Sequence, residues 1–290
     1  MLILQLAVGG LLVGGSYALV GLGLTFIYRN LGLFNFAHGD YLMVSMYVTY
    51  GLWQAMHIDP YLTMLLNIPI MFAIGAATYA LVIRWTQRAS HLVQVFVTFG
   101  LSIIAENALL LLVDGNPRSV TPSYADSTLS LGSIQISVTA LAAFGASAVA
   151  TAVLALLLYR TRFGKALRAT GSSSFAAELA GIDTSKMRMA VFATGTATLG
   201  VAGTVLAPIY SVYPTFGATF ILIVFVLVVI GGLGSLVGAL VAGVALGILQ
   251  AIGGYYLNPN VEQALFFALL IAVLALRPRG LFGSKEILAR

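Results

Sequence analysis

Apolar runs repeat along the whole chain and are separated by short polar gaps. A helix needs roughly 20 apolar residues to cross the hydrocarbon core of a bilayer. The runs cover residues 2–27, 31–57, 61–83, 92–113, 136–159, 189–212, 216–231, 236–253 and 261–276. Two of them, 216–231 and 261–276, are short, so each is predicted to be either a tilted span extended at its ends or a re-entrant segment. The pattern predicts an all-α, polytopic transmembrane bundle of eight or nine spans, forming a single domain over residues 1–290.

The composition agrees with a membrane protein and excludes several other classes. Hydrophobic residues make up 60% of the chain and charged residues only 8%, whereas about 25% of a soluble globular protein is charged. No cysteine is present, which excludes disulfides, thiolate metal sites and cysteine nucleophiles. The histidines His38, His57 and His91 lie far apart, so no metal site is predicted. The net charge of +5 does not indicate nucleic acid, because membrane topology accounts for the basic residues.

Residues 160–188 form a basic island between two apolar runs and hold six of the fourteen Lys and Arg residues. Serines at 172–174, followed by an apolar stretch and Gly181, predict a short helix that begins at the serines and ends at the glycine. Such a helix outside the bilayer becomes stable by docking Phe175, Leu179 and Ile182. We interpret the island as a docking element for a cytosolic protein. An ordinary basic loop that fixes topology remains the alternative.

The distribution of basic residues predicts the orientation. With nine spans and the island inside, thirteen basic residues face the cytosol and Arg118 alone lies outside, which is the bias that membrane insertion produces. The C-terminus is then cytosolic and the N-terminus external, although a miscounted re-entrant segment would reverse the N-terminus. Residues 114–135 form the largest outer loop, either a contact for an external partner or a plain connector. The cytosolic set comprises Arg29, Arg84, Arg88, the six island residues, Arg277, Arg279, Lys285 and Arg290.

Polar residues interrupt the second apolar run near its start. Asn35, His38 and Asp40 lie there, bracketed by Gly32 and Gly39. Polar groups at membrane depth are costly and usually face the bundle interior or a water-filled path. The glycines permit a broken helix, which a membrane tolerates only where it is buried in protein or lines a cavity. Two interpretations stay open: these residues line a translocation path, or they satisfy backbone groups at a helix break.

A weaker signal of the same kind lies in the run at 92–113. Glu106 and Asn107 are adjacent, so they do not share a helix face and one of them is expected to point inward. Glu106 therefore joins the candidates for the path. Intramembrane carboxylates would also suit a secondary transporter working alone, for which Asp40, Glu106 and Glu262 are the candidate ion sites.

Small residues recur every four positions in the run that follows Gly231. This period lets helix backbones approach closely and predicts a tightly packed helix with two crowded faces. The chain lacks the Gly-Lys-Ser/Thr of a phosphate-binding loop, so it is expected to be a non-catalytic subunit that does not hydrolyse ATP in that way. One face holds Gly234, Gly238 and Ala242, and the other holds Ala239, Gly243 and Gly247.

Five motifs taken together resemble the permease subunits of branched-chain amino acid ABC importers, the LivH type. They occur in the family's order over about residues 10–283. The resemblance implies a bacterial inner-membrane permease, without a cofactor, that is surrounded by lipid and transports an amino acid. The implied partners are a second related permease, two cytosolic P-loop ATPases and a periplasmic solute-binding protein. The motifs are GSYALVGLGLT at 15–25, NFAHG at 35–39, GKALRA at 164–169 with AGI at 180–182, GGLGSLVGA at 231–239, and RPRGLFG at 277–283.

In that family the cytosolic loop supplies a coupling helix that sits in a groove of the ATPase, and alternating access follows from its movement. Members often carry acidic residues near the positions of Ser172 and Ser173, where this chain is neutral. Related permeases also carry urea and short amides, so those substrates are alternatives to branched-chain or related amino acids. The coupling residues implied here are Gly164, Arg168, Ala169, Ala176, Ala177, Ala180, Gly181 and Ile182.

Overall fold

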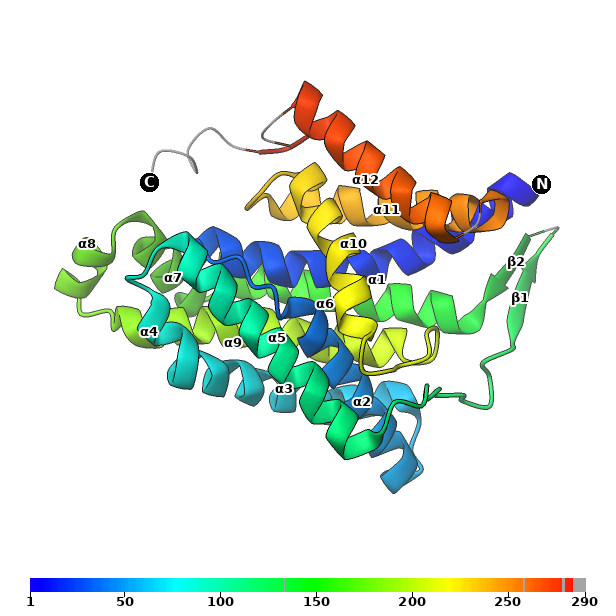
Figure 1. Ribbon diagram of the computed structural model, residues 1–290, viewed down its shortest axis with the longest axis horizontal. Coiled ribbons are helices and arrows are strands. Elements are labelled where there is room, and N and C mark those ends of the chain that lie inside the picture. Colours follow the sequence, from blue (N-terminus) through cyan, green and yellow to red (C-terminus); the bar gives the residue numbers. More distant parts are fainter. Residues whose placement is uncertain (133, 258, 278–279, 284–290) are drawn as a thin grey trace.

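A computed structural model describes the chain except for residues 133, 258, 278–279 and 284–290 (Figure 1). Each predicted apolar run contains a helix, and the all-α polytopic bundle is confirmed. The basic residues Arg279, Lys285 and Arg290 lie outside the described residues, as does the side chain of Glu262. The long helices are α1 (Leu2–Leu31), α2 (His38–Met56), α3 (Met64–Thr78), α5 (His91–Val113), α6 (Val138–Arg160), α9 (Thr184–Leu206), α10 (Phe216–Gly231), α11 (Leu236–Tyr256) and α12 (Pro259–Leu276).

Shorter elements complete the chain. A 3-10 turn, η1 (Pro60–Thr63), precedes α3, which continues through a π-helical turn, η2 (Tyr79–Ile83), into α4 (Arg84–Thr86). The outer loop contains a two-stranded antiparallel hairpin, β1 (Thr128–Leu131) and β2 (Ile134–Ser137). The basic island forms α7 (Arg162–Ser172) and α8 (Ser174–Leu179). Figure 1 shows α7 and α8 at one end of the bundle, here named the basic end, and the hairpin at the opposite end, here named the hairpin end.

The spans differ in length. Within the described residues, six helical segments are long and apolar enough to cross a membrane: 2–31, 60–86, 91–113, 138–160, 184–206 and 236–256. The helix α10 and the apolar part of α12 are shorter, as their runs predicted. The predicted number of spans, eight or nine, exceeds these six; the remaining apolar runs form α2, α10 and α12, which are not among the six. The chain is a multi-pass membrane protein.

Two helix-break-helix units build the centre of the bundle. The first is α1, a non-helical break at 32–37, and α2; the second is α9, a break at 207–215, and α10. Ile27 contacts Gly195 while Gly23 contacts Thr198, so α1 and α9 run in opposite directions. The neighbours correspond as well, because α11 packs on α1 as α3 packs on α9, and α2 packs on α10. This is an inverted repeat, the arrangement that many transporters place around a binding site.

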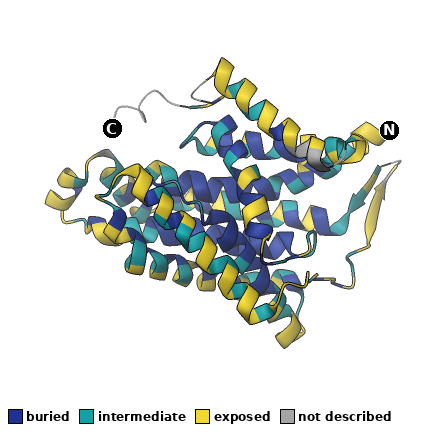
Figure 2. Cartoon of the chain, viewed as in Figure 1, coloured by how far each residue is buried: buried dark blue, intermediate teal, exposed yellow. Residues whose placement is uncertain are grey.

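Burial follows this plan. Of the apolar window in α9, 78% is buried inside the chain, against 6% in α5, so α9 is central and α5 is peripheral. Figure 2 shows the buried residues gathered in the middle of the bundle and the exposed ones on its outer helices and ends. The exposed apolar side chains of α5, such as Phe96 and Ile104, suit lipid or a second membrane subunit.

The small residues of α11 lie where they bring backbones together. Gly243 packs against the backbone of Ala18, and Gly247 packs against Gly10 and Gly14 of α1. Gly238 packs against the carbonyl of Gly231 at the end of α10. Gly234 was expected on the same helix face but lies outside the helix, in the turn before α11, with a φ of +81°. Its conformation is the left-handed one that glycine adopts readily, so it shapes the turn.

Candidate functional site

The predicted helix break lies between α1 and α2. Gly32 ends α1 with a φ of +65°, and its N–H donates to the carbonyl of Tyr28 (2.8 Å). The chain then continues without helical structure to Ala37, and α2 begins at His38. Burial alternates along the break: Leu33, Asn35 and Ala37 are buried, whereas Phe34 and Phe36 are half-buried. One side of the break therefore faces the core and the other faces a more open surface.

A threonine of α5 satisfies the backbone of this break. The N–H of Phe36 donates to the hydroxyl oxygen of Thr98 (3.2 Å), and the Thr98 hydroxyl approaches the carbonyls of Phe34 (3.3 Å) and Val95 (3.0 Å). Thr98 is fully buried. A buried backbone group needs a partner, and here the neighbouring helix supplies it. Sequence reasoning missed Thr98, because a threonine in an apolar run carries no distinct signal.

The three polar residues singled out in the sequence are all buried at the start of α2. Asn35, His38 and Asp40 each have 0% exposure. His38 Nε2 donates to the carbonyl of Val20 on α1 (3.0 Å), so one ring nitrogen fastens α2 to α1. Within the described part of the chain, no hydrogen-bond partner is found for His38 Nδ1, both amide atoms of Asn35 or both carboxylate oxygens of Asp40. Each unpaired buried group costs about 1–3 kcal/mol, and a charged one costs more.

The first turn of α10 covers Asp40. A methyl group on Gly217 would overlap the backbone nitrogen and Cα of Asp40 and meet its carboxylate oxygen Oδ1. Gly39 in turn packs against the carbonyl of Gly217 and the side chain of Ile221. Neither α2 nor α10 has a side-chain cap at its N-terminus. Two positive helix ends thus meet at a carboxylate, the charge that such ends favour.

The fourth residue of the predicted path lies on α5. Glu106 is half-buried and acts electrostatically on Asp40, and Ser102, one turn earlier, also lies beside that carboxylate. Asn107 is exposed and donates to the carbonyl of Ile103 in its own helix (2.8 Å). Of the two adjacent polar residues, Glu106 is therefore the one that faces α2. Of the other residues predicted for the path, Glu106 is thus brought near Asp40.

Aromatic rings line the more open side of the break. We name Tyr28, Phe34, Phe36 and Phe225 the aromatic patch. The ring of Phe225, on α10, lies 4.7 Å from that of Phe36 and 6.0 Å from that of Phe34, centroid to centroid. The rings of Tyr28 and Phe34 are 4.4 Å apart. This patch places an apolar surface beside the buried polar residues.

A second buried polar cluster joins α2, α3 and α9. The side-chain amide nitrogen of Asn67 lies within 2.9 to 3.1 Å of the hydroxyls of Ser45, Thr49 and Thr204, and the Ser45 hydroxyl donates to the carbonyl of Leu199 (2.6 Å). All four polar side chains have 0% exposure. The cluster holds α2 against the central helix. The sequence analysis did not predict this cluster, although Asn67, a polar residue in the middle of an apolar run, could have indicated it.

The basic end folds α7 against the end of α6. Thr161 caps α7 by accepting from the N–H of Gly164 (3.1 Å). Gly164 is buried and packs against the carbonyl of Leu158. The same carbonyl oxygen accepts a hydrogen bond from the Arg168 guanidinium. Arg168 lies over the ring of Tyr159, 5.9 Å from its centroid. Among the predicted coupling residues, Gly164 is buried and Ala169 is exposed, whereas Arg168 is exposed but contacts Leu158 and Tyr159 of its own chain.

The predicted short helix is present as α8, and its start and end are confirmed. Ser173 accepts from the N–H of Ala176 (3.2 Å), and Gly181 follows the helix with a φ of +79°. Ala177 is buried, whereas Phe175 and Leu179 are 72% and 76% exposed. Ile182 is half-buried, and the other predicted coupling residues of α8, namely Ala176, Ala180 and Gly181, are exposed. The helix therefore presents two large apolar side chains outward.

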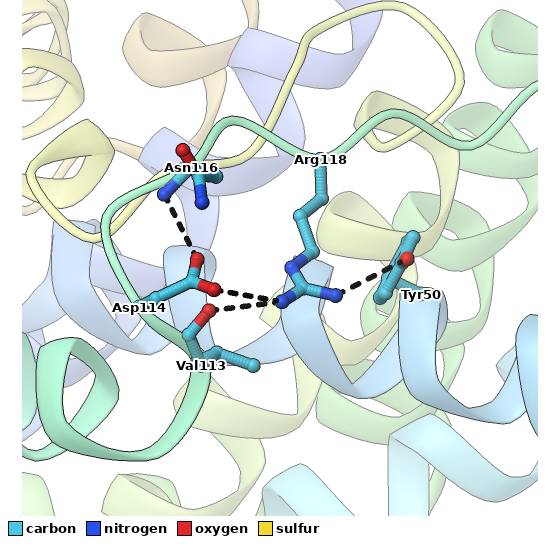
Figure 3. A network of polar contacts seen from close by, with 5 residues as sticks. All are labelled: Tyr50, Val113, Asp114, Asn116 and Arg118. Atoms are coloured by element: carbon cyan, nitrogen blue, oxygen red, sulfur yellow. Dashed lines mark hydrogen bonds and ion pairs between the residues drawn. The ribbon is translucent and has the colours of Figure 1, made fainter.

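Arg118 connects several segments at the hairpin end through its side chain and its backbone (Figure 3). Its guanidinium donates to the carbonyl of Val113 (2.9 Å) and to the Tyr50 hydroxyl (3.4 Å), and it lies 3.6 Å from the Asp114 carboxylate. Its backbone forms a two-way bridge with Val212 in the second break (2.9 and 2.8 Å). The segment around Arg118 is thus a strap that ties α2 and α5 to the segment leading into α10. A cavity of about 520 Å³ beside it is lined by Tyr50, Trp53, Gln54, His57 and Ser119.

Comparisons with known proteins agree with this architecture. Residues 6–274 match the family described as the permease component of the branched-chain amino acid transport system. The high-affinity branched-chain amino acid transport permease LivH of Salmonella typhimurium is 31% identical over 98% of this chain and 96% of its own length. BraD of Pseudomonas aeruginosa is 29% identical over 98% and 97%, and a probable LivH of Methanocaldococcus jannaschii is 30% identical over 95% and 91%. No solved structure matches the chain. The chain belongs to the branched-chain amino acid transport permease family.

Proposed function

We propose that this chain is the membrane permease of an ATP-driven importer for branched-chain or related amino acids. It pairs with a second related permease, two cytosolic P-loop ATPases drive the pair, and a periplasmic binding protein delivers the amino acid. The family membership and the substrates in the relatives' names support this proposal. The observation that carries it is the exposure of Phe175 and Leu179 on α8, because large apolar side chains on a basic segment outside the membrane need a partner protein.

The proposed location is the bacterial inner membrane, with the basic end and the C-terminus in the cytosol and the hairpin end in the periplasm. The exposed charges of α7 support this orientation, as do Arg29 at the end of α1 and Arg84 in α4. Basic residues near span ends are retained on the cytosolic side. Arg118, the exception at the hairpin end, is engaged by Val113, Tyr50 and Asp114.

The proposed translocation path runs over α2, between α5 and α10. Both helices pack on α2, and Glu106 of α5 acts on Asp40 of α2 across this surface. Asn35 and His38, the other residues proposed for the path, lie buried at the start of α2. The peripheral position of α5 lets a second permease complete the path from the other side. The aromatic patch supplies an apolar lining suited to an aliphatic side chain.

Coupling is proposed to pass from α8 through α9 to α10. Glu178 of α8 accepts from the hydroxyl of Thr184 (2.6 Å), and Asp183 caps α9 by accepting from the N–H of Lys186 (3.0 Å). The two helices therefore move together when an ATPase displaces α8. At its other end α9 leads through the second break into α10, which covers Asp40. A shift of α10 relative to α2 opens one side of the path and closes the other, as alternating access requires.

The test is purification of the tagged chain from native membranes, followed by uptake in proteoliposomes. Wild type is expected to bring a second permease and P-loop ATPases with it, and to take up leucine in an ATP-dependent manner but neither urea nor acetamide. The variant Leu179→Glu is expected to lose the ATPases. The control Ser185→Glu adds the same charge at an exposed position of the same segment and is expected to keep them. Uptake by the chain alone, driven by an ion gradient, would instead identify an autonomous secondary transporter.

A further inference from the structure

The buried polar side chains at the start of α2 offer both hydrogen-bond donors and hydrogen-bond acceptors. Asp40 and the amide oxygen of Asn35 are acceptors, and the amide nitrogen of Asn35 is a donor; within the described residues all of these atoms are buried without a partner. The first residue of each helix already donates its N–H, His38 to the carbonyl of Asn35 (3.2 Å) and Phe216 to that of Tyr213 (2.9 Å). The following residues of the first turns of α2 and α10 add backbone N–H groups that have no intrahelical partner by helix geometry and that no side chain caps. A cation would use only the acceptors and an anion only the donors. A ligand with an ammonium and a carboxylate uses both.

We propose that Asp40, Asn35 and the first turns of α2 and α10 form the binding site for the head group of the transported amino acid. This rests on the proposed function, in that the substrate is an α-amino acid. The ammonium is held by the carboxylate of Asp40 and the amide oxygen of Asn35. The carboxylate of the ligand lies against the N–H groups of the two helix ends, whose partial positive charge favours it.

The position in the fold supports this assignment. The site lies where the two inverted units meet, Gly39 of one unit against Gly217 of the other. In transporters built from inverted repeats, broken helices direct their N-termini at anionic groups of the substrate in that region. Asp40 sits within the buried core and not on a solvated surface, so its carboxyl group is not solvated by water and gains from a cationic partner.

The face of α10 explains how an aliphatic side chain fits beside the head group. Gly217, Ile221 and Phe225 are spaced by four residues, so they share one face of the helix. Gly217 lies on Asp40, Ile221 lies on Gly39, and Phe225 lies against Phe36. The polar end of the site therefore continues directly into an apolar strip. In this conformation Gly217 closes the site, and movement of α10 away from α2 opens it.

Because the chain has no cysteine, a single introduced thiol can report on the site. Ser102 lies beside Asp40 and is partly exposed, and Ser102→Cys changes little in size. In the assembled transporter in proteoliposomes, the thiol is expected to react about tenfold faster with a cationic methanethiosulfonate than with an anionic one, because of the nearby carboxylate. Asp40→Asn is expected to remove this preference. Asp126→Asn, in the exposed outer loop, is the control and is expected to retain it.

Ligand protection tests the head-group assignment. Leucine is expected to slow the labelling of Cys at position 102, whereas 4-methylpentanoate, which lacks the ammonium, and 3-methylbutylamine, which lacks the carboxylate, are expected to protect little. Asp40→Asn is expected to abolish protection by leucine. Equal protection by leucine and the amine, or undiminished protection by leucine in Asp40→Asn, would overturn the proposal. Leucine uptake by wild type in the same vesicles distinguishes failure of the proposed function from failure of the proposed site. Absence of uptake refutes the proposed function. Uptake without any effect of leucine on the labelling of position 102 refutes only the site.

Discussion

Gly217 of α10 lies directly on Asp40 of α2, although the two residues belong to opposite halves of the chain. The contact joins the two inverted units at the positions where their second helices begin. A side chain at 217 would overlap the backbone of Asp40, so glycine is required for the helices to meet. We expect the function of the permease to depend on making and breaking this contact.

The variant Gly217→Val tests that dependence. The added methyl groups hold α10 away from α2, so the closed conformation is lost and ATP-driven uptake is expected to fall by at least about tenfold, equivalent to roughly 1.4 kcal/mol. Membrane insertion is expected to persist, because the span stays apolar. Ala218→Val, at the neighbouring exposed position, is the control. Normal uptake by Gly217→Val would show that α10 does not need to approach α2.

Replacement by alanine is expected to have opposite effects on stability at two glycines, one in the contact between α11 and α1 and the other on α6. Gly243→Ala is expected to lower the free energy of unfolding, because its Cβ would overlap the backbone of Ala18. Gly145 on α6 has open space around it, so Gly145→Ala is expected to raise that free energy by about 0.5–1 kcal/mol through lower chain entropy. Thermal unfolding in detergent measures both. Equal behaviour of the two variants would contradict the observed packing.

Substitution of Asn67, at the centre of the buried polar cluster, is expected to lower the stability of the protein. Asn67→Leu removes the amide that links Ser45, Thr49 and Thr204, and is expected to cost about 1–3 kcal/mol. Asn107→Leu is the control, because Asn107 is exposed and bonds only to its own helix. The midpoint of thermal unfolding is expected to fall for the first variant and to stay unchanged for the second. A similar midpoint for both would mean that the cluster does not hold α2 in place.

The strap at the hairpin end predicts a local change in dynamics. Arg118→Ala removes the hydrogen bonds to Val113 and Tyr50 but leaves the backbone able to bridge to Val212. Amide hydrogen exchange is expected to become faster in residues 114–120 and 207–215, because two of their anchors are lost. Tyr50→Phe removes one hydrogen bond and is expected to have a smaller effect. Unchanged exchange in the second break would show that the strap does not control it.

The sequence alone determined the elements and several of their ends. Every apolar run contains a helix, because a bilayer leaves the backbone no partner outside its own helix and so makes the secondary structure local. The break near Asn35 and the short helix between Ser173 and Gly181 were predictable for a similar reason. Glycines and serines act on the backbone immediately around them.

Tertiary structure decided what depends on residues distant in sequence. In the segment that follows α12, the N–H groups of Leu281 and Phe282 donate to the carbonyls of Ile230 and Gly231 and so complete the end of α10, a contact that no local pattern signals. The inverted repeat likewise became visible only in the tertiary structure, as did the fact that Glu106, and not Asn107, faces α2. Composition and periodicity state which residues must be buried, but the partner of each buried group is fixed only when the helices pack, because close backbone contacts join segments that share no local signal.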